Sequence, residues 1–276
     1  IYLCLGIDRE RIVPNLADRA DDIFIGQIRN GLRRHVFGYG HYQSFTDTLI
    51  RVLQPPSRKN LFRRYLIKIT DGDSETKMND FNYFDHVYGG WLGKCLGGAA
   101  GAPVEGVKKL IDRDFREMIR PDLPNDDLDM QLLWLEVLEE KGLSLTANDL
   151  AKAWDEHCWY PFSEYGIFLK NYERGIMPPY SGSFNNPFFC EGEGCPIRSE
   201  IWAMVFPNDP DKAAYYAGLD GSLDHVGESV WIEQYYAAVE SRAFTQTDII
   251  GLLKSQLHFL PESSRARGCA ALVFSS

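Results

Sequence analysis

The stretch Asn125-Asp126-Asp127-Leu128-Asp129-Met130-Gln131 places three carboxylates directly before the apolar residues 132–135. One interpretation is a helix N-terminus, where Asn and Asp side chains accept hydrogen bonds from free N–H groups and negative charge is favoured. The other is a divalent-metal site, because carboxylates this close repel one another unless a cation lies between them. Both interpretations stay open at this point, and both place the stretch at the start of a helix.

Length and composition indicate an enzyme-sized, soluble protein. The chain has 276 residues, 45% of them hydrophobic, and no run approaches the roughly 18 apolar residues of a membrane span. The N-terminal residues 1–6 meet charge at Asp8, too early for a signal peptide. The six cysteines are scattered without the spacing of a disulfide framework. We therefore expect a cytoplasmic protein with reduced thiols, no zinc and no membrane partner.

The net charge of −10 is distributed unevenly along the chain. Residues 1–77 hold 13 Lys and Arg against 9 Asp and Glu, a net of +4, so residues 78–276 hold 16 against 30, a net of −14. This contrast predicts a boundary near Lys77, between an unassigned basic N-terminal segment (1–77) and a second domain (78–276). The acidic part should repel nucleic acid, and the short basic doublets of the first part are typical of a solvated face.

The two parts also differ in their apolar pattern. In the first, residues 19–32 favour a helix and residues 65–69 a strand. From Phe84 onward the pattern is helical, and helices are expected at residues 130–141, 146–157, 211–219, 228–244 and 247–259. Glycines at 89, 93, 97 and 101 form a row at i, i+4 spacing, which predicts close packing or a ligand along that row. Residues 175–195 read as a long polar loop, and the second domain as all-α.

Two motifs at a fixed spacing resemble a known family. The segment Gly97-Gly98-Ala99-Ala100-Gly101-Ala102-Pro103-Val104-Glu105-Gly106, followed about twenty residues later by Asn125-Asp126-Asp127, looks like the paired N-terminal signature of the ADP-ribosylglycohydrolases. The resemblance continues through residues 178–186, 197–210 and 223–227, and ends near Arg267.

The resemblance implies an all-α fold with a binuclear Mg²⁺ or Mn²⁺ centre. The implied reaction is hydrolysis of the glycosidic bond between ADP-ribose and a protein side chain or a small acceptor, so the implied partner is an ADP-ribosylated protein or a small ADP-ribose conjugate. By motif, Asn125, Asp126 and Asp127 would be metal ligands, and Glu105 and Asp127 would be catalytic. Cations held by carboxylates could orient the ribose hydroxyls while a nearby carboxylate activates water. A salt-bridged loop carboxylate is the simpler interpretation of Glu105.

Further residues are assigned to substrate binding. His225 matches a family histidine near the ligand, although without the resemblance a capping or core histidine is the favoured interpretation. Arg198 could bind a phosphate, or could brace its loop through an ion pair to Glu200 or Glu191. Three polar residues that could line a ribose or diphosphate pocket, or simply form turns, are Ser183, Asn185 and Asn186.

The sequence also departs from the family pattern. Gly98 stands where many members carry Asp, Leu128 replaces a common Thr, and Asp129 adds a carboxylate. No Asp-x-Asp-Thr motif, the family's second metal half-site, follows Arg267, so we expect weak metal binding in this chain. Two alternatives to the hydrolase follow: a non-catalytic ADP-ribose-binding or structural member of the family, and a magnesium-dependent isoprenoid diphosphate enzyme, whose aspartate-rich helices resemble residues 126–129.

Overall fold

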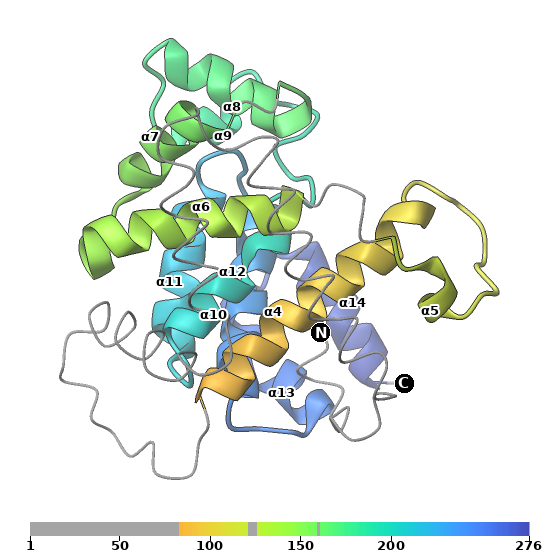
Figure 1. Ribbon diagram of the computed structural model, residues 1–276. Coiled ribbons are helices and arrows are strands. Elements are labelled where there is room, and N and C mark those ends of the chain that lie inside the picture. Colours follow the sequence, from red (N-terminus) through yellow and green to blue (C-terminus); the bar gives the residue numbers. More distant parts are fainter. Residues whose placement is uncertain (1–82, 121–125, 159–160, 276) are drawn as a thin grey trace, which may run out of the picture. The chain divides into compact units, whose positions relative to one another are not determined.

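The computed structural model describes residues 83–120, 126–158 and 161–275, and every regular element in these ranges is a helix (Figure 1). This confirms the predicted all-α fold class. Within the same ranges no helix is both long enough and apolar enough to cross a membrane. The predicted helix at residues 19–32, the predicted strand at 65–69 and the predicted boundary near Lys77 lie outside the described residues.

The chain folds into two compact units, and the division falls between Leu132 and Leu133. The described elements of the N-terminal unit are α4 (Tyr83–Gly101), the 3-10 helix η3 (Ala102–Val104), α5 (Phe115–Met118) and the first part of α6 (Asp126–Lys141). Those of the C-terminal unit are the rest of α6, η4 (Gly142–Ser144), α7 (Ala147–His157), α8 (Ser163–Glu173), α9 (Tyr180–Ser183), η5 (Pro196–Arg198), α10 (Glu200–Val205), α11 (Pro210–Gly221), α12 (Glu228–Ala243), α13 (Ile249–Ser255), η6 (Leu257–Phe259) and α14 (Arg265–Ser275). Helix α6 therefore contributes residues to both units.

Helix α4 buries a face other than its glycine row. The buried face consists of Val87, Trp91, Cys95 and Ala99, at i, i+4 spacing. Gly89 follows the first of these by two residues, which is about 200° around a helix. Among the described residues, a Cβ placed on Gly89 or Gly101 would meet nothing within 4 Å. At these two ends of the row the prediction of close packing is wrong, because the apolar side chains that drive burial lie on the opposite side.

Helix α6 begins at Asp126, earlier than the predicted start at Met130, and ends at Lys141 as predicted. Gly142 follows with a φ of 59°, the left-handed conformation in which glycine commonly ends a helix. The acidic stretch at 126–129 is therefore the first turn of the helix itself. Its position agrees with the favourable interaction of negative charge with a helix N-terminus.

Helices α7 and α11 start at local capping signals that the sequence displays. The Thr146 side chain accepts a hydrogen bond from the N–H of Asp149 at 3.3 Å, and the Asp149 carboxylate accepts one from the N–H of Thr146 at 2.8 Å. Asp209 accepts a hydrogen bond from the N–H of Lys212 at 3.3 Å, with Pro210 at the first helical position. Both starts lie within one residue of the prediction because each depends on neighbours in the sequence.

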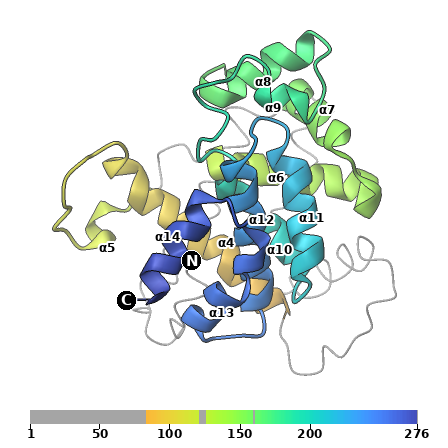
Figure 2. The same ribbon diagram turned by 180° about the vertical axis from the view of Figure 1, so that it is seen from behind.

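The α11–α12 pair is the most extensive helix contact among the described elements, and α10 packs against both helices (Figure 2). Both helices carry small buried residues, namely Ala213, Ala214 and Ala217 on α11 and Ala237 and Ala238 on α12. Small side chains allow helix axes to lie close together. The ends of these helices and the short segments before them carry the residues of the site described below.

Helices α8, α10 and α14 were not expected from the sequence. The start of α14 shows why, since its cap comes from Glu228 of α12. Glu228 Oε1 accepts a hydrogen bond from the N–H of Arg265 at 2.7 Å, and Oε2 accepts from Ser264 Oγ at 2.9 Å and from the N–H of Ala266 at 3.3 Å. A cap supplied from a distant part of the chain leaves no local signal.

The predicted helix at residues 247–259 is divided into α13 and η6. Asp248 caps α13 by accepting a hydrogen bond from the N–H of Gly251 at 3.1 Å, and the regular helix stops at Ser255. These elements close an apolar cluster whose buried members are Tyr235, Val239, Ala243, Leu252 and Leu260. Residues 175–195 are predicted to form a loop. In the structure the short helix α9 forms within them.

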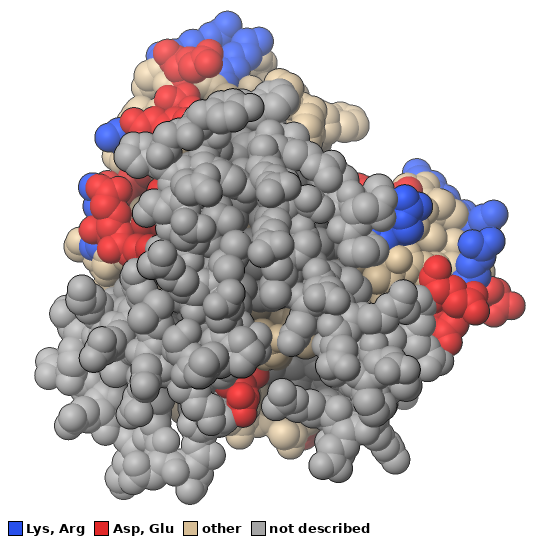
Figure 3. Space-filling model, viewed as in Figure 1, with Lys and Arg blue, Asp and Glu red and all other residues tan. Residues whose placement is uncertain are grey.

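Charged side chains of both signs lie next to one another in the described parts of the surface that Figure 3 shows. Exposed ion pairs join Lys152 to Glu156 at 3.7 Å and Lys212 to Asp209 at 3.0 Å. Pairs of this kind contribute little to stability, about 0–1 kcal/mol. The expectation that nucleic acid is not a partner stays a prediction.

Candidate functional site

The predicted metal and catalytic residues lie at the start of α6 and after η3. Asp126 and Asp127 are the first two residues of α6, and the Asp127 side chain is half-buried. Glu105 is exposed at the residue that follows η3, where its N–H donates to the carbonyl of Ala102 at 3.4 Å. Asn125 lies outside the described residues. The metal and catalytic roles of these residues stay predictions.

The types of side chain at the start of α6 indicate which metal would fit there. In the ranges that the structure describes, no group of three or more His, Cys, Asp or Glu residues could hold a metal ion. Asn125 and the Asp126 side chain are outside what is described, so two of the three predicted ligands are not tested. Asp129 is buried, two residues and about 200° beyond Asp127, so these two carboxylates face different directions. Carboxylate and amide oxygens are the ligands that Mg²⁺ prefers.

The structure joins the segment 181–186 directly to the segment 223–225. Ser181 Oγ donates to the carbonyl of Leu223 at 2.6 Å. A Cβ placed on Gly182 would stand 2.6 Å from both the backbone N and the backbone O of His225, so only glycine fits here. Asn186 Nδ2 donates to the carbonyls of Gly182 at 3.0 Å and Asp224 at 3.3 Å. Asn186 and His225, two of the predicted substrate-binding residues, are thus brought together.

Ser183 and Asn185 lie on the exposed side of the same segment. Ser183 is exposed and its Oγ donates to the carbonyl of Tyr180 at 3.3 Å. Asn185 is exposed with a φ of 52°, a left-handed conformation that asparagine adopts more readily than most residues. Both side chains are accessible to a ligand, whereas Asn186 is buried and accepts from the N–H of Phe189 at 3.2 Å.

Arg198 is completely buried in η5 and forms a network of charged hydrogen bonds. Its Nε donates to Asp220 Oδ1 at 3.0 Å, and its Nη1 and Nη2 donate to the two carboxylate oxygens of Asp224 at 3.1 and 2.8 Å. Nη1 also donates to the carbonyl of Gly194 at 3.1 Å. The guanidinium carbon lies 5.3 Å from the centroid of the Trp154 ring. Arg198 therefore braces its loop, through Asp220 and Asp224 rather than through the partners suggested by the sequence, Glu200 or Glu191.

Asp220 is the second anchor of this network. Its Oδ2 accepts hydrogen bonds from the indole N–H groups of Trp134 at 2.8 Å and Trp202 at 3.0 Å. The sequence predicts Trp134 as a core residue, which its complete burial confirms, and the structure adds its polar contact. A buried indole N–H needs an acceptor, and Asp220 supplies one for two indoles.

Burial and neighbouring charges shift the pKa values of the acidic side chains in this network in different directions. Burial raises the pKa of Asp224, but the opposing charges of Arg198 and His225 bring it well below its usual range. Burial raises the pKa of Asp220, with Arg198 and the Trp202 indole opposing the shift. Glu233 is completely buried, and burial followed by the charge of Asp220 raises its pKa. Within the buried site, the pKa of Asp224 is thus lowered and the pKa values of Asp220 and Glu233 are raised.

Asp220, Trp202 and Glu233 were missed by sequence reasoning. The available signal was the i, i+4 spacing of Asp220 and Asp224, which suggests two carboxylates on one side of a helix end and hence a cation between them. Nothing in the local sequence identifies Arg198 as that cation.

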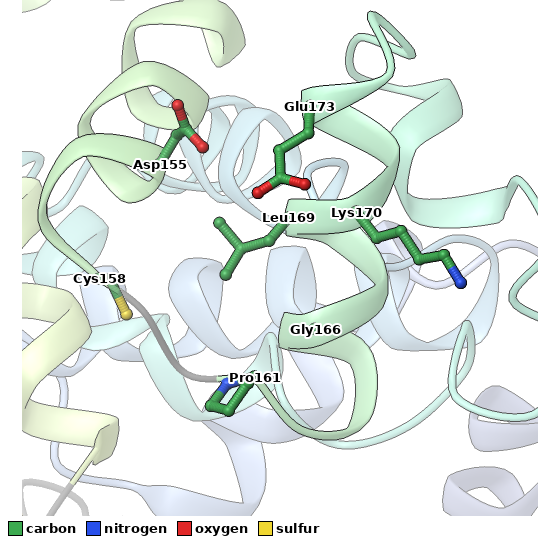
Figure 4. Close-up of a pocket in the computed structure, with 7 residues that line it drawn as sticks. All are labelled: Asp155, Cys158, Pro161, Gly166, Leu169, Lys170 and Glu173. Carbon is green, nitrogen blue, oxygen red and sulfur yellow. The ribbon is translucent and has the colours of Figure 1, made fainter.

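A separate surface hollow of about 360 Å³ lies between α7 and α8 (Figure 4). It is lined by Asp155, Cys158, Pro161, Gly166, Leu169, Lys170 and Glu173. In Figure 4 the carboxylates of Asp155 and Glu173 point into the space between the helices, and Lys170 points away from it. None of the predicted site residues lines this hollow.

Comparison with known proteins adds a family match that is independent of this geometry. A family model described as ADP-ribosylglycohydrolase matches residues 79–274, a range that contains all the predicted site residues and well over half of the chain. No curated protein and no solved structure matches the chain.

Proposed function

Because the chain belongs to the ADP-ribosylglycohydrolase family, we propose that it hydrolyses the glycosidic bond between ADP-ribose and a protein side chain or a small acceptor, with a divalent cation as cofactor. The observation that carries this proposal is the family match over residues 79–274, which supports a glycohydrolase-type function. Metal dependence and the choice of substrate are our extension of that match.

The cation is assigned to the start of α6. Asn125, Asp126 and Asp127 offer amide and carboxylate oxygens, the donor types that suit Mg²⁺ or Mn²⁺. When bound, a cation of this kind supplies positive charge that orients ribose hydroxyls and stabilises the developing charge of the transition state. Asp127, half-buried in the first turn of α6, is also assigned to catalysis.

Glu105 is assigned to the water that attacks the glycosidic bond. Its carboxylate is exposed next to η3, so it is accessible to solvent and to a ligand. A carboxylate in hydrogen-bonding reach of a water can orient that water and accept its proton as the bond to the sugar forms.

Binding of the ADP-ribose moiety is assigned to the segments 181–186 and 223–225. Ser183 and Asn185 offer exposed polar side chains. Asn186 and Arg198 are buried and hydrogen-bonded, so they contribute by holding these segments in place. His225 lies at the contact between the two segments, where Gly182 meets its backbone.

The direct test is release of ADP-ribose by the full chain from peptides carrying ADP-ribosylated arginine or serine, in the presence of Mg²⁺ or Mn²⁺. We expect release with at least one peptide, and its loss in Asp127→Ala. Asp211→Ala is the matched control, because Asp211 is an exposed aspartate in the first turn of α11. It should leave the rate unchanged.

Two results would contradict the proposal. A folded protein that releases no ADP-ribose from any of these peptides with either metal would refute the hydrolase. If such a protein still binds ADP-ribose in calorimetry, the non-catalytic alternative takes its place. An Asp127→Ala variant with the activity of the wild type would remove Asp127 from the catalytic residues.

A further inference from the structure

The imidazole of His225 is completely buried, and within the described residues Nε2 has no hydrogen-bonding partner. Nδ1 lies 2.8 Å from Oδ1 of Asp224, which is hydrogen-bonding distance. Buried polar groups without a partner are rare in proteins, because their desolvation is not compensated. The ring therefore carries one nitrogen that Asp224 can satisfy and a second, Nε2, that the fold leaves open.

Asp224 faces this ring as an ionised carboxylate. Arg198 holds it through two parallel hydrogen bonds, and the guanidinium charge keeps the pKa of Asp224 low despite its burial. An ionised carboxylate only accepts hydrogen bonds, so the ring nitrogen beside it must carry a proton. In the neutral imidazole that proton is on Nδ1, and Nε2 is left as an acceptor.

Two glycines and the carboxylate of Glu164 lie near the other edge of the ring. A Cβ placed on Gly192 would stand 3.6 Å from Nε2, and one on Gly194 would stand 3.0 Å from Cε1 and closer still to Oε1 of Glu164. Ser229 Oγ donates to the carbonyl of Gly192, and Arg198 donates to that of Gly194. The backbone beside Nε2 is thus held by hydrogen bonds to its carbonyl groups. Because the ring is completely buried, contact between Nε2 and a ligand requires the segment beside the ring to move.

We propose that Asp224 is a positioning residue that fixes His225 as the Nδ1–H tautomer, so that Nε2 accepts a hydrogen bond from a hydroxyl group of the ligand. The inference rests on the proposed function, because it takes His225 as a residue that contacts ADP-ribose. An acceptor nitrogen matches a ribose hydroxyl, which has a proton to donate, and does not match an ionised phosphate oxygen, which has none. Arg198 holds the Asp224 carboxylate through hydrogen bonds, and Asp220 in turn holds Arg198.

The tautomer can be measured directly by ¹⁵N NMR on the full chain labelled at histidine, with His225→Gln to assign the signals. We expect a protonated Nδ1 and an unprotonated Nε2 in the neutral imidazole of the wild type. In Asp224→Asn, Arg198 occupies the amide oxygen and the NH₂ group turns to the ring, so the proton should move to Nε2. A wild type with its proton on Nε2 overturns the proposal.

Binding of ADP-ribose, measured by calorimetry, tests the ligand contact. Asp224→Asn should weaken binding about tenfold, the effect of one lost hydrogen bond. Asp209→Asn, a change at the exposed cap of α11, should alter neither the tautomer nor the affinity. An Asp224→Asn variant with the proton on Nε2 and unchanged affinity overturns the ligand contact.

These measurements separate the inference from the proposed function. If Asp224→Asn fails to fold, as circular dichroism would show, the wild-type tautomer alone decides the role of Asp224. A wild type that has the Nδ1–H tautomer but neither binds nor releases ADP-ribose refutes the proposed function while the positioning of His225 by Asp224 stands.

Discussion

Replacing Arg198 by methionine should destabilise the fold strongly, because it leaves two buried carboxylates without their cation. Arg198, Asp220 and Asp224 are all fully buried, and the guanidinium donates to both carboxylates. Removing one partner of a buried ion pair costs about 3–5 kcal/mol, since the remaining charge stays uncompensated. Asp220 keeps its two indole donors, so most of the loss should come from Asp224. We expect the free energy of unfolding at neutral pH to fall by about 3–5 kcal/mol.

Urea unfolding followed by tryptophan fluorescence measures this change, provided that the m value stays the same. Arg265→Met is the matched control. Arg265 also pairs with a carboxylate, Glu191, at 2.7 Å, but its side chain is 73% exposed. An exposed pair contributes at most about 1 kcal/mol, so the control should lose no more than that.

The pH dependence of this loss in the free energy of unfolding is a second test of the prediction. In the wild type the low pKa of Asp224 adds stability above its unfolded pKa of about 3.9, and that stability is lost as the pH falls through the folded pKa. Without Arg198, burial raises the pKa of both carboxylates, so the folded variant binds protons that the unfolded chain has released and becomes more stable on acidification. The difference in the free energy of unfolding between the wild type and Arg198→Met should therefore shrink towards about pH 5. A loss within about 1 kcal/mol of the control, or a difference that widens in acid, would refute the reasoning.

Four further substitutions test other parts of the fold. Gly182→Ala would place a Cβ 2.6 Å from the backbone of His225 and should cost about 1–3 kcal/mol, whereas Gly89→Ala, whose Cβ meets nothing within 4 Å, should stabilise α4 by about 0.5–1 kcal/mol. Thermal unfolding of both variants is the measurement, and effects of the same sign would show that the close approach at Gly182 is not real. Thr146→Ala removes the side-chain oxygen of the α7 capping box and should lower the free energy of unfolding by about 1 kcal/mol, as a shift of the urea midpoint; an unchanged midpoint would mean that the box contributes nothing. Glu233→Gln removes a carboxyl whose pKa is raised by burial. Because such a group keeps its proton in the folded chain while the unfolded chain releases it above about pH 4.3, the variant should gain stability over the wild type as the pH rises, and a constant difference in thermal midpoint from about pH 5 to 8 would contradict this.

Helices were predictable from the sequence where their ends depend on neighbouring residues. The starts of α7 and α11 follow from Thr146 and Asp209, and the end of α6 follows from Gly142. Helix α14 was not predictable, because Glu228 caps it from a different helix. The buried face of α4 was not predicted from the sequence, because the interpretation considered the glycine row and not the apolar row on the opposite side of the helix.

The candidate site was predictable only in part. The family resemblance identified Arg198 and His225, and the structure places both in the same buried network. The resemblance did not identify Asp220, and its i, i+4 spacing with Asp224 does not identify the cation between them. Its importance comes from the approach of η5, α6 and α10, which bring one guanidinium and two indoles to one carboxylate. Such convergence depends on tertiary packing, which no local pattern records.

The carboxylate of Glu228 links the beginnings of two helices that are far apart in the chain. It stands in the first turn of α12 and accepts the first N–H groups of α14. Fraying at the start of α14 therefore exposes a buried carboxylate of α12, and fraying at the start of α12 removes the cap of α14. Because each opening requires the other, the amides of the two helix starts should exchange their hydrogens with solvent as one cooperative unit, with a shared free energy of opening.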